Sequence, residues 1–298
     1  MDCKKKKLDV GGQAVIEGVM LRSPHYWAVA VRKPDGEIEV KKDKLNLLSE
    51  KNKLFKLPIV RGVIMLLSAL VLGIKALNFS ANVAYDEEEE MGDWAIYGTI
   101  GFAFAIAIAV FFVLPLYITK IFNFQSYFVF NIVDGIIRII FFLLYVYAIS
   151  FMDDIKRIFQ YHGAEHKVIY SYEEDESVTV DSAKKYSTLH PRCGTSFLII
   201  VLLISILIFS LVPKSSPFYV KLLSRIVLIP LIAGLSYEAL KLSAKYKDNI
   251  FIKLFIKPGL WLQKITTKEP DESQIEVALA ALKAVLQLEK GEVNVTEA

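Results

Sequence analysis

Three of the four histidines of this chain fall in one polar segment, residues 152–195, between two apolar stretches. His162 and His166 stand in the pattern H-x-x-E-H, with Glu165 between them. On a helix both imidazoles share one face and could bind one divalent metal ion. Inverted zincins have this spacing, and their glutamate serves as general base toward water. Gly163 weakens the prediction of a helix.

A second group of candidate ligands lies at the end of the same segment. His190 and Cys193 stand in His-Pro-Arg-Cys-Gly-Thr. Both residue types bind zinc, and the proline and glycine suit a tight turn. Packing of the flanking apolar helices would bring this turn beside His162 and His166. We therefore predict a divalent metal site, best suited to Zn²⁺, made by His162, His166 and either His190 or Cys193, with one open position.

Two other interpretations of these residues remain. Four ligands, His162, His166, His190 and Cys193, would form a closed structural site without catalysis. Without a metal, Cys193 would be a nucleophile assisted by a histidine.

Ionisable residues inside the apolar stretches are a further set of candidates. Placing the ionisable side chain of Glu238 at membrane depth costs free energy, so we expect a functional role for it, and Glu238 is a candidate additional ligand. Pairing of Glu238 with Arg225 or Lys241 is the alternative. Asp134 and Arg138 are four residues apart, and we expect them to pair with each other.

The N-terminal region offers candidate substrate contacts. Residues 11–18 contain closely spaced glycines but lack the Gly-Lys-Ser/Thr ending of a phosphate-binding loop. Glu17, Arg22 and His25 accompany these glycines and could face the metal site. The glycines could instead only permit close packing.

The composition indicates a membrane protein with polar parts. Of the 298 residues, 54% are hydrophobic and 22% are charged, so apolar and polar blocks should alternate. The net charge of +3 does not favour a nucleic-acid partner. Cys3 and Cys193 make no disulfide framework, which fits a reducing compartment.

Four apolar stretches are long enough to cross a bilayer as helices: 94–118, 127–151, 196–212 and 222–243. The stretch 58–85 carries Arg61 and Lys75, so it could span, re-enter, or lie in the interface. If it does not cross, the basic regions 1–57, 152–195 and 244–298 all lie in the cytoplasm, as the distribution of Lys and Arg predicts.

We therefore predict a predominantly α membrane protein with four transmembrane helices in two hairpins, a re-entrant or interfacial helix, and a small β-containing cytoplasmic part. Residues 26–32 and 37–41 should form a β-hairpin around Pro34-Asp35-Gly36. Ser273 to Glu276 reads as a capping box that opens a C-terminal amphipathic helix. We expect the acidic run 86–90 to be a solvated loop. The expected parts are 1–57, 58–85, the hairpin 94–151, the connection 152–195, the hairpin 196–243 and 244–298.

Four separated motifs carry a resemblance over nearly the whole chain. They are Gly11–Met20, Tyr161–Lys167, His190–Ser196 and Thr266–Asp271, and they resemble the bacterial YqhQ-type family. Members are described as predicted metal-dependent membrane enzymes. The resemblance thus implies a metal role for His162, Glu165, His166, His190 and Cys193, but it implies no substrate.

These observations favour a metal-dependent hydrolase at the cytoplasmic face of the cell membrane. Its substrate would be a lipid or a segment of a membrane protein, because the motifs adjoin helix ends. The alternative is a non-enzymatic accessory or scaffold subunit of a membrane complex, such as protein translocation or quality-control machinery, with the terminal helix as a docking element. A transporter is less favoured, because four spans without internal repeats leave little room for a pathway.

Overall fold

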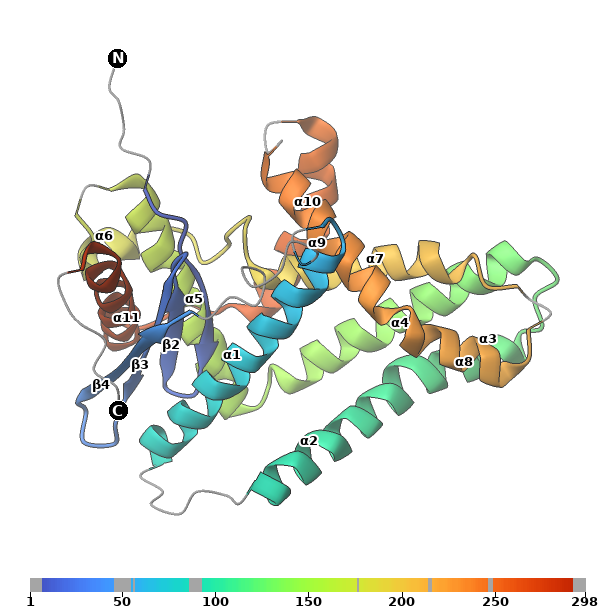
Figure 1. The fold of residues 1–298 in the computed structure, drawn as a ribbon, viewed down its shortest axis with the longest axis horizontal. Coiled ribbons are helices and arrows are strands. Elements are labelled where there is room, and N and C mark those ends of the chain that lie inside the picture. The colour runs from blue at the N-terminus through green and yellow to red at the C-terminus, as the bar shows by residue number, and fades with distance from the viewer. Residues whose placement is uncertain are drawn as a thin grey trace.

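The computed structural model describes residues 7–45, 55, 57–85, 93–175, 177–213, 216–245 and 249–291. These residues are mainly helical and include a four-stranded antiparallel sheet. Figure 1 shows the sheet at one end of the molecule and α3 (Leu114–Ile121) and α8 (Phe218–Val227) at the other. The acidic run 86–90, expected to be a solvated loop, lies outside the described residues.

The sheet consists of β1 (Gly11–Val15), β2 (Gly18–Arg22), β3 (Tyr26–Arg32) and β4 (Ile38–Lys44), in this spatial order. The predicted hairpin is confirmed, since β3 pairs with β4. Its turn contains Gly36 at a φ of 92°, and Asp35 accepts a hydrogen bond from the Glu37 amide. The β1–β2 hairpin was not predicted, because its turn, Ile16-Glu17, lacks the Asn-Gly or Asp-Gly signal.

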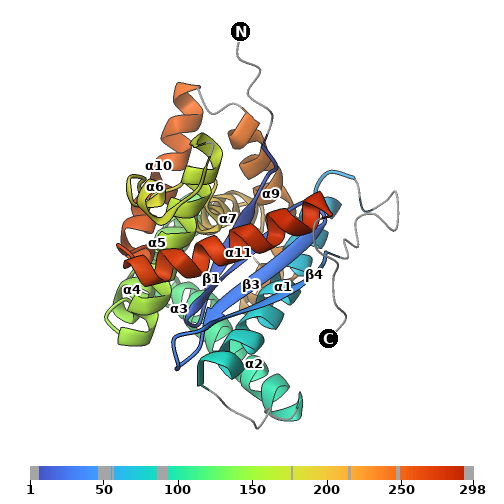
Figure 2. The same ribbon diagram turned by 90° about the vertical axis from the view of Figure 1, so that its left-hand side faces the viewer.

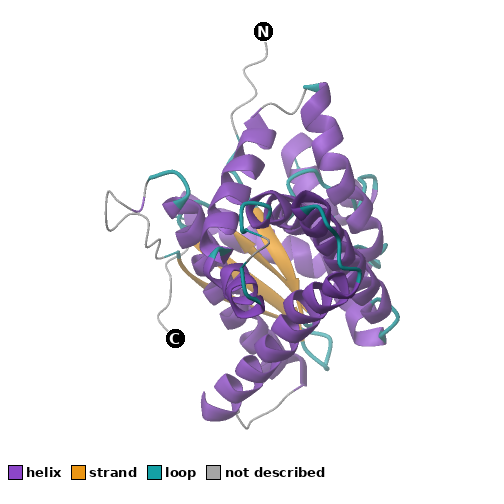
Figure 3. Cartoon of the chain, turned by 90° about the vertical axis from the view of Figure 1, so that its right-hand side faces the viewer, coloured by secondary structure: helices purple, strands orange, loops and turns teal. Residues whose placement is uncertain are grey.

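Both faces of the sheet are covered, as expected from alternation along the strands. One face packs against α5 (Asp153–Glu174) and α11 (Glu272–Lys290), and Figure 2 shows α11 lying across the strands. The other face packs against α1 (Val60–Tyr85). Buried side chains on the first face are Val19, Leu21, Ala28 and Ala30, and those on the second are Met20, Trp27, Val29 and Val31. Figure 3 shows the strands enclosed among helices.

Helix α11 is the predicted amphipathic helix, and its apolar face is buried inside this protein. A partner therefore cannot use that face for docking. The predicted capping box is wrong by two residues. Asp271 is the N-cap, and it exchanges hydrogen bonds with Gln274, while Ser273 only supports the Asp271 carboxylate.

Asp271→Ala should destabilise the protein by about 1 kcal/mol, because the first turn of α11 loses its side-chain acceptor. We expect an apparent melting temperature lower by about 2–4 °C in detergent. Asp271→Asn keeps an acceptor and should melt like the wild type. Equal loss in both variants would contradict the capping role.

Three helical segments of the described chain are long and apolar enough to cross a membrane, or four if one bent pair counts as a single span. They are α1, the segment 101–121 that joins α2 (Asp93–Ile108) through the π-helix Ala109–Val113 to α3, and α4 (Tyr127–Ile149). The bent pair is α8 with α9 (Ile229–Lys245), which meet at 45°.

The last two expected spans differ from the prediction. Helix α7 (Gly194–Phe209) has 16 residues and is about 24 Å long, short of the ~30 Å hydrocarbon core. The stretch 222–243 is broken at Leu228, just before Pro230, which cannot donate a backbone hydrogen bond.

A buried charge cluster joins α4 to α8. Asp134 Oδ2 accepts hydrogen bonds from Arg138 Nη2 at 2.7 Å and from Arg225 Nη2 at 2.8 Å. The expected Asp134–Arg138 pair is therefore confirmed, and the suggested pairing of Arg225 with Glu238 is wrong. Arg138 Nε also donates to the carbonyl of Phe111, which lies in the π-helix.

Candidate metal centre

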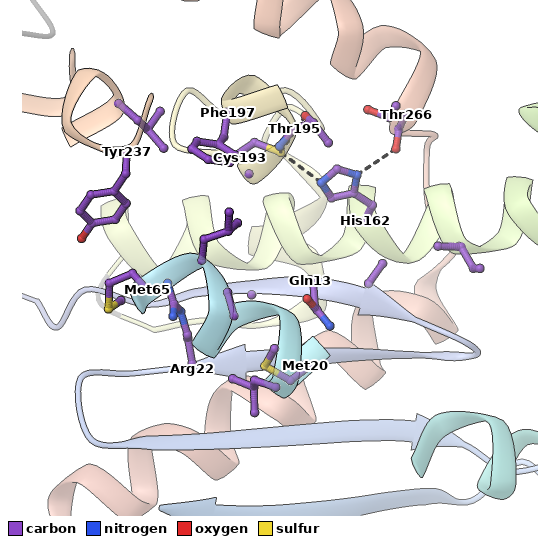
Figure 4. A pocket seen from close by; sticks show the side chains of 18 of the residues that line it. Gln13, Met20, Arg22, Met65, His162, Cys193, Thr195, Phe197, Tyr237 and Thr266 are labelled. Carbon is purple, nitrogen blue, oxygen red and sulfur yellow. Dashed lines mark hydrogen bonds between the residues drawn. The ribbon is translucent and has the colours of Figure 1, made fainter. Parts of the chain in front are cut away.

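Three potential ligands converge where α5 meets the start of α7. His162 and His166 project from α5, and Cys193 is the N-cap residue of α7. His162 Nε2 lies 3.2 Å from Cys193 Sγ, a contact that Figure 4 marks with a dashed line. One ligand atom from each of His162, His166 and Cys193 lies within 4.8 Å of the other two. The arrangement can therefore hold one ion.

Backbone carbonyls fix the orientation of both imidazoles. His162 Nδ1 donates to the carbonyl of Thr266 at 2.8 Å, and His166 Nδ1 donates to that of Thr188. A carbonyl only accepts, so each Nδ1 carries the proton and each Nε2 keeps its lone pair. Histidine ligands of metals are usually held in this way. Burial lowers the pKa of His166, which keeps this imidazole neutral near pH 7.

Cys193 lies at the start of α7, where backbone N–H groups can stabilise a negative charge on its sulfur. Its sulfur is buried and accepts a hydrogen bond from the Thr195 amide at 3.4 Å. Free N–H groups at a helix N-terminus favour anionic groups. A thiolate ligand or a thiolate nucleophile would both benefit from this position.

Glu165 lies beside the cluster and not in it. Its carboxylate is buried and accepts a hydrogen bond from the backbone of Gly12, while Oε2 has no hydrogen-bond partner among the described residues. Burial raises the pKa of Glu165. Glu165 stays the predicted general base.

His190 does not join the three converging ligands. Its ring lies 5.7 Å from that of His166 and 4.4 Å from that of Tyr170. Burial lowers the pKa of His190 to about 4, so its 3.6 Å approach to Glu173 is no ion pair near pH 7. Of the two predicted third ligands, the structure brings Cys193 to the pair of histidines.

Gly163 allows another segment of the chain to pack closely against α5, which the sequence did not indicate. Helix α5 runs through it without a break, and a Cβ atom here would lie 2.1 Å from the carbonyl oxygen of Lys268. Lys167 also pairs with Glu269 at 2.6 Å. Segment 266–271 therefore presses against α5, which places the Thr266 carbonyl at His162.

Residues 57–288 match the model of a family described as "Protein of unknown function (DUF1385)". The chain belongs to the DUF1385 family. It is also 35% identical to "Uncharacterized protein YqhQ" of Bacillus subtilis (strain 168), over 94% of this chain and 92% of that protein. The expected relationship to the YqhQ-type family is thereby confirmed. No solved structure matches the chain.

The other candidate residues of this DUF1385 protein do not lie in the cluster. Glu17 pairs with Arg157 and accepts a hydrogen bond from Tyr161. His25 contacts Glu289 at 3.1 Å. The remaining candidate carboxylate, Glu238, pairs with Arg61 of α1, which neither sequence alternative named.

A cavity of about 500 Å³ adjoins the cluster of this DUF1385 protein. His162, Cys193, Thr195 and Thr266 form part of its wall, and Arg22 forms another part (Figure 4). The cluster is therefore reachable from this cavity. Sequence reasoning missed the carbonyls of Thr188 and Thr266, although Thr266 lies in Thr266–Asp271, one of the four stretches on which the resemblance to the YqhQ-type family rested.

Proposed function

We propose that this protein is a zinc-dependent hydrolase of the cell membrane. The observation that carries the proposal is the convergence of His162, His166 and Cys193, with both Nδ1–H groups donating hydrogen bonds to backbone carbonyls. Three protein ligands beside a cavity suit a catalytic zinc site, whereas structural sites usually have four ligands. The unpartnered Oε2 of Glu165 adds a buried polar atom that a water molecule would satisfy.

Each of these residues would have its own role in the reaction. Zinc would supply Lewis acidity. His162, His166 and Cys193 would hold it, and Glu165 would take a proton from the attacking water. The ester or amide bond of the substrate breaks, the acyl carbon gains the hydroxyl, and the leaving group gains the proton.

Packing of α1 on the sheet supports an interfacial place for this helix. If α1 crossed the bilayer, the neighbouring strand β4 would enter hydrocarbon with Lys41, Lys42 and Lys44. Unpaired sheet edges and lysines are costly there. Lys41 Nζ lies 5.3 Å from the ring centre of Phe79, so the second half of α1 is at the same depth as β4. With α1 in the interface, both termini and the cluster lie on the cytoplasmic side.

A metal-free thiol enzyme is the second candidate. The 3.2 Å separation of His162 Nε2 from Cys193 Sγ favours it, because imidazole can activate a thiol at this distance. Zinc content separates the two candidates. The accessory-subunit hypothesis has lost one argument, since the apolar face of α11 is buried within this chain.

Glu165→Gln should keep zinc and lower hydrolysis by about 10²–10⁴-fold, because the amide cannot accept the proton. Zinc is measured by elemental mass spectrometry. Hydrolysis is measured by mass spectrometry of new products after the reconstituted protein is incubated with total membrane lipids. Glu289→Gln, on the remote end of α11, is the matched control. A wild-type protein without stoichiometric zinc would refute the proposal.

A further inference from the structure

Arg22 differs from every other arginine of this chain. It has no carboxylate partner among the residues that the structure describes, and it is half-buried at the end of β2 in the cavity wall. The other arginines all pair with carboxylates: Arg32 with Glu276, Arg61 with Glu238, Arg138 and Arg225 with Asp134, Arg157 with Glu17, and Arg192 with Asp9 and Glu173. A half-buried guanidinium without a counter-ion in the wall of a cavity indicates that a ligand supplies the anion.

The rest of the cavity is mainly apolar. Helix α1 contributes Met65, Leu66, Ala69 and Leu72 to its wall, and α7 and α9 add Phe197 and Leu240. The outward side of α1 is apolar as well, with exposed Leu66, Leu67, Leu70, Val71 and Ile74. Leu66 belongs to both surfaces. The cavity therefore adjoins the apolar outer face of α1 that we place in the interface.

The charged and reactive groups line different parts of one cavity. Figure 4 shows Arg22 with Met65 and Met20 on the side of the sheet and α1, and His162 with Cys193 on the side of α5 and α7. A molecule that spans the cavity can thus contact Arg22 at one end and the histidine–cysteine cluster at the other.

We propose that the cavity binds an anionic membrane lipid, whose headgroup pairs with Arg22 and whose acyl chain lies along α1. As a substrate assignment this rests on the proposed hydrolase function. Arginine suits the role because its planar fork binds phosphate through two hydrogen bonds. Tyr237 also lines the cavity and adds a hydroxyl. Burial lowers the pKa of Arg22, and a bound phosphate would offset that effect.

The test is lipid binding by the purified full-length protein in detergent. Fluorescent phosphatidylglycerol is titrated beside phosphatidylcholine with the same acyl chains. Wild type should prefer the anionic lipid. Arg22→Gln should weaken phosphatidylglycerol binding by about ten- to a hundredfold and phosphatidylcholine binding much less, because the choline cation of that lipid offsets the charge of its phosphate. Arg22→Lys should retain part of the preference, because it keeps the charge without the fork.

Two further variants test whether the lipid binds in this cavity and not at the neighbouring surface. Lys75→Gln removes a cation from the neighbouring cavity of about 200 Å³, which Arg22 also lines, and should leave binding unchanged. Ala69→Phe fills the apolar part and should weaken both lipids without changing charge. Equal losses in Arg22→Gln and Lys75→Gln would mean general attraction to surface charge and would overturn the proposal.

Competition identifies the occupant. Inorganic phosphate should displace the lipid only at large excess, because it lacks the acyl chain. Displacement at concentrations similar to those of the lipid, by phosphate or by an acidic apolar peptide, would overturn the assignment to lipid. Zinc is measured on every sample. Arg22-dependent lipid binding by a zinc-free wild type would refute the zinc-dependent hydrolase and leave the lipid site standing.

Discussion

Replacing His162 or His166 with alanine, or Cys193 with serine, should remove zinc from the purified protein. Wild type is expected to carry about one zinc ion per chain. Each change deletes one of three ligands, and even loss of a residue that only orients a ligand typically weakens metal binding 10- to 100-fold. We therefore expect more than about a hundredfold loss of affinity, measured by competition with a chelator and by elemental mass spectrometry.

The chain supplies its own controls for this experiment. His25→Ala changes a histidine that contacts Glu289 in the last turn of α11 and does not line the cavity, and it should keep zinc. His190→Ala tests the residue that the sequence placed in the ligand set and the structure does not. It should reduce zinc much less than His162→Ala does. Unchanged zinc in all three ligand variants would exclude this cluster as the metal site.

A zinc-free wild type calls for a different measurement at the same residues. Rapid alkylation of Cys193 by iodoacetamide at neutral pH, slowed by His162→Ala, would then support the thiol candidate. Slow alkylation of Cys193 in both the wild type and His162→Ala would exclude the thiol candidate.

Asp134→Ala should be the most destabilising single change in the apolar part of the protein. Arg138 and Arg225 are 3% and 1% exposed, and Asp134 is the carboxylate that both contact. Removal of one partner of a buried ion pair typically costs about 3–5 kcal/mol. We expect poor yield in the membrane and an apparent melting temperature roughly 6–20 °C lower.

The controls distinguish an unpaired charge from lost packing. Asp154→Ala, in the exposed first turn of α5, should change the melting temperature by only a few degrees. Combining Asp134→Leu with Arg138→Leu and Arg225→Leu leaves no buried charge and should melt above Asp134→Ala. An Asp134→Ala protein that melts like the wild type would show that water or lipid phosphate replaces the carboxylate as the partner of Arg138 and Arg225.

Local patterns allowed part of the fold and the site to be predicted. The hairpin of β3 and β4 has a Pro-Asp-Gly turn between alternating residues, and α11 has an apolar stripe, so both could be read without tertiary information. The H-x-x-E-H spacing likewise placed His162 and His166 on one face of a helix. These features depend on neighbours in sequence.

The parts that failed depend on contacts between distant residues. Ile16-Glu17 turns because β1 and β2 pair, and α7 ends at Phe209, before the predicted end of the span at 212. Gly163 is unfavourable in an isolated helix, but its lack of a Cβ atom leaves room for the backbone of Lys268. The partner of Glu238 is Arg61, 177 residues away, and no local pattern indicates that pairing. The choice of Cys193 over His190 depends in the same way on how α5 packs against α7.

The contact between the first strands and the last helix also orders events during synthesis. The sheet is translated early, but α11, which covers its face at Val19, Leu21, Ala28 and Ala30, is translated after all the other described helices. The carbonyl of Thr266 that orients His162 is likewise late. Until α11 leaves the ribosome, one apolar face of the sheet therefore stays uncovered, and until residue 266 leaves it, His162 lacks the carbonyl that orients its ring. A nascent chain that stalls before residue 266 would lack the carbonyl that orients His162, and its exposed sheet would make it a target for chaperones and proteases.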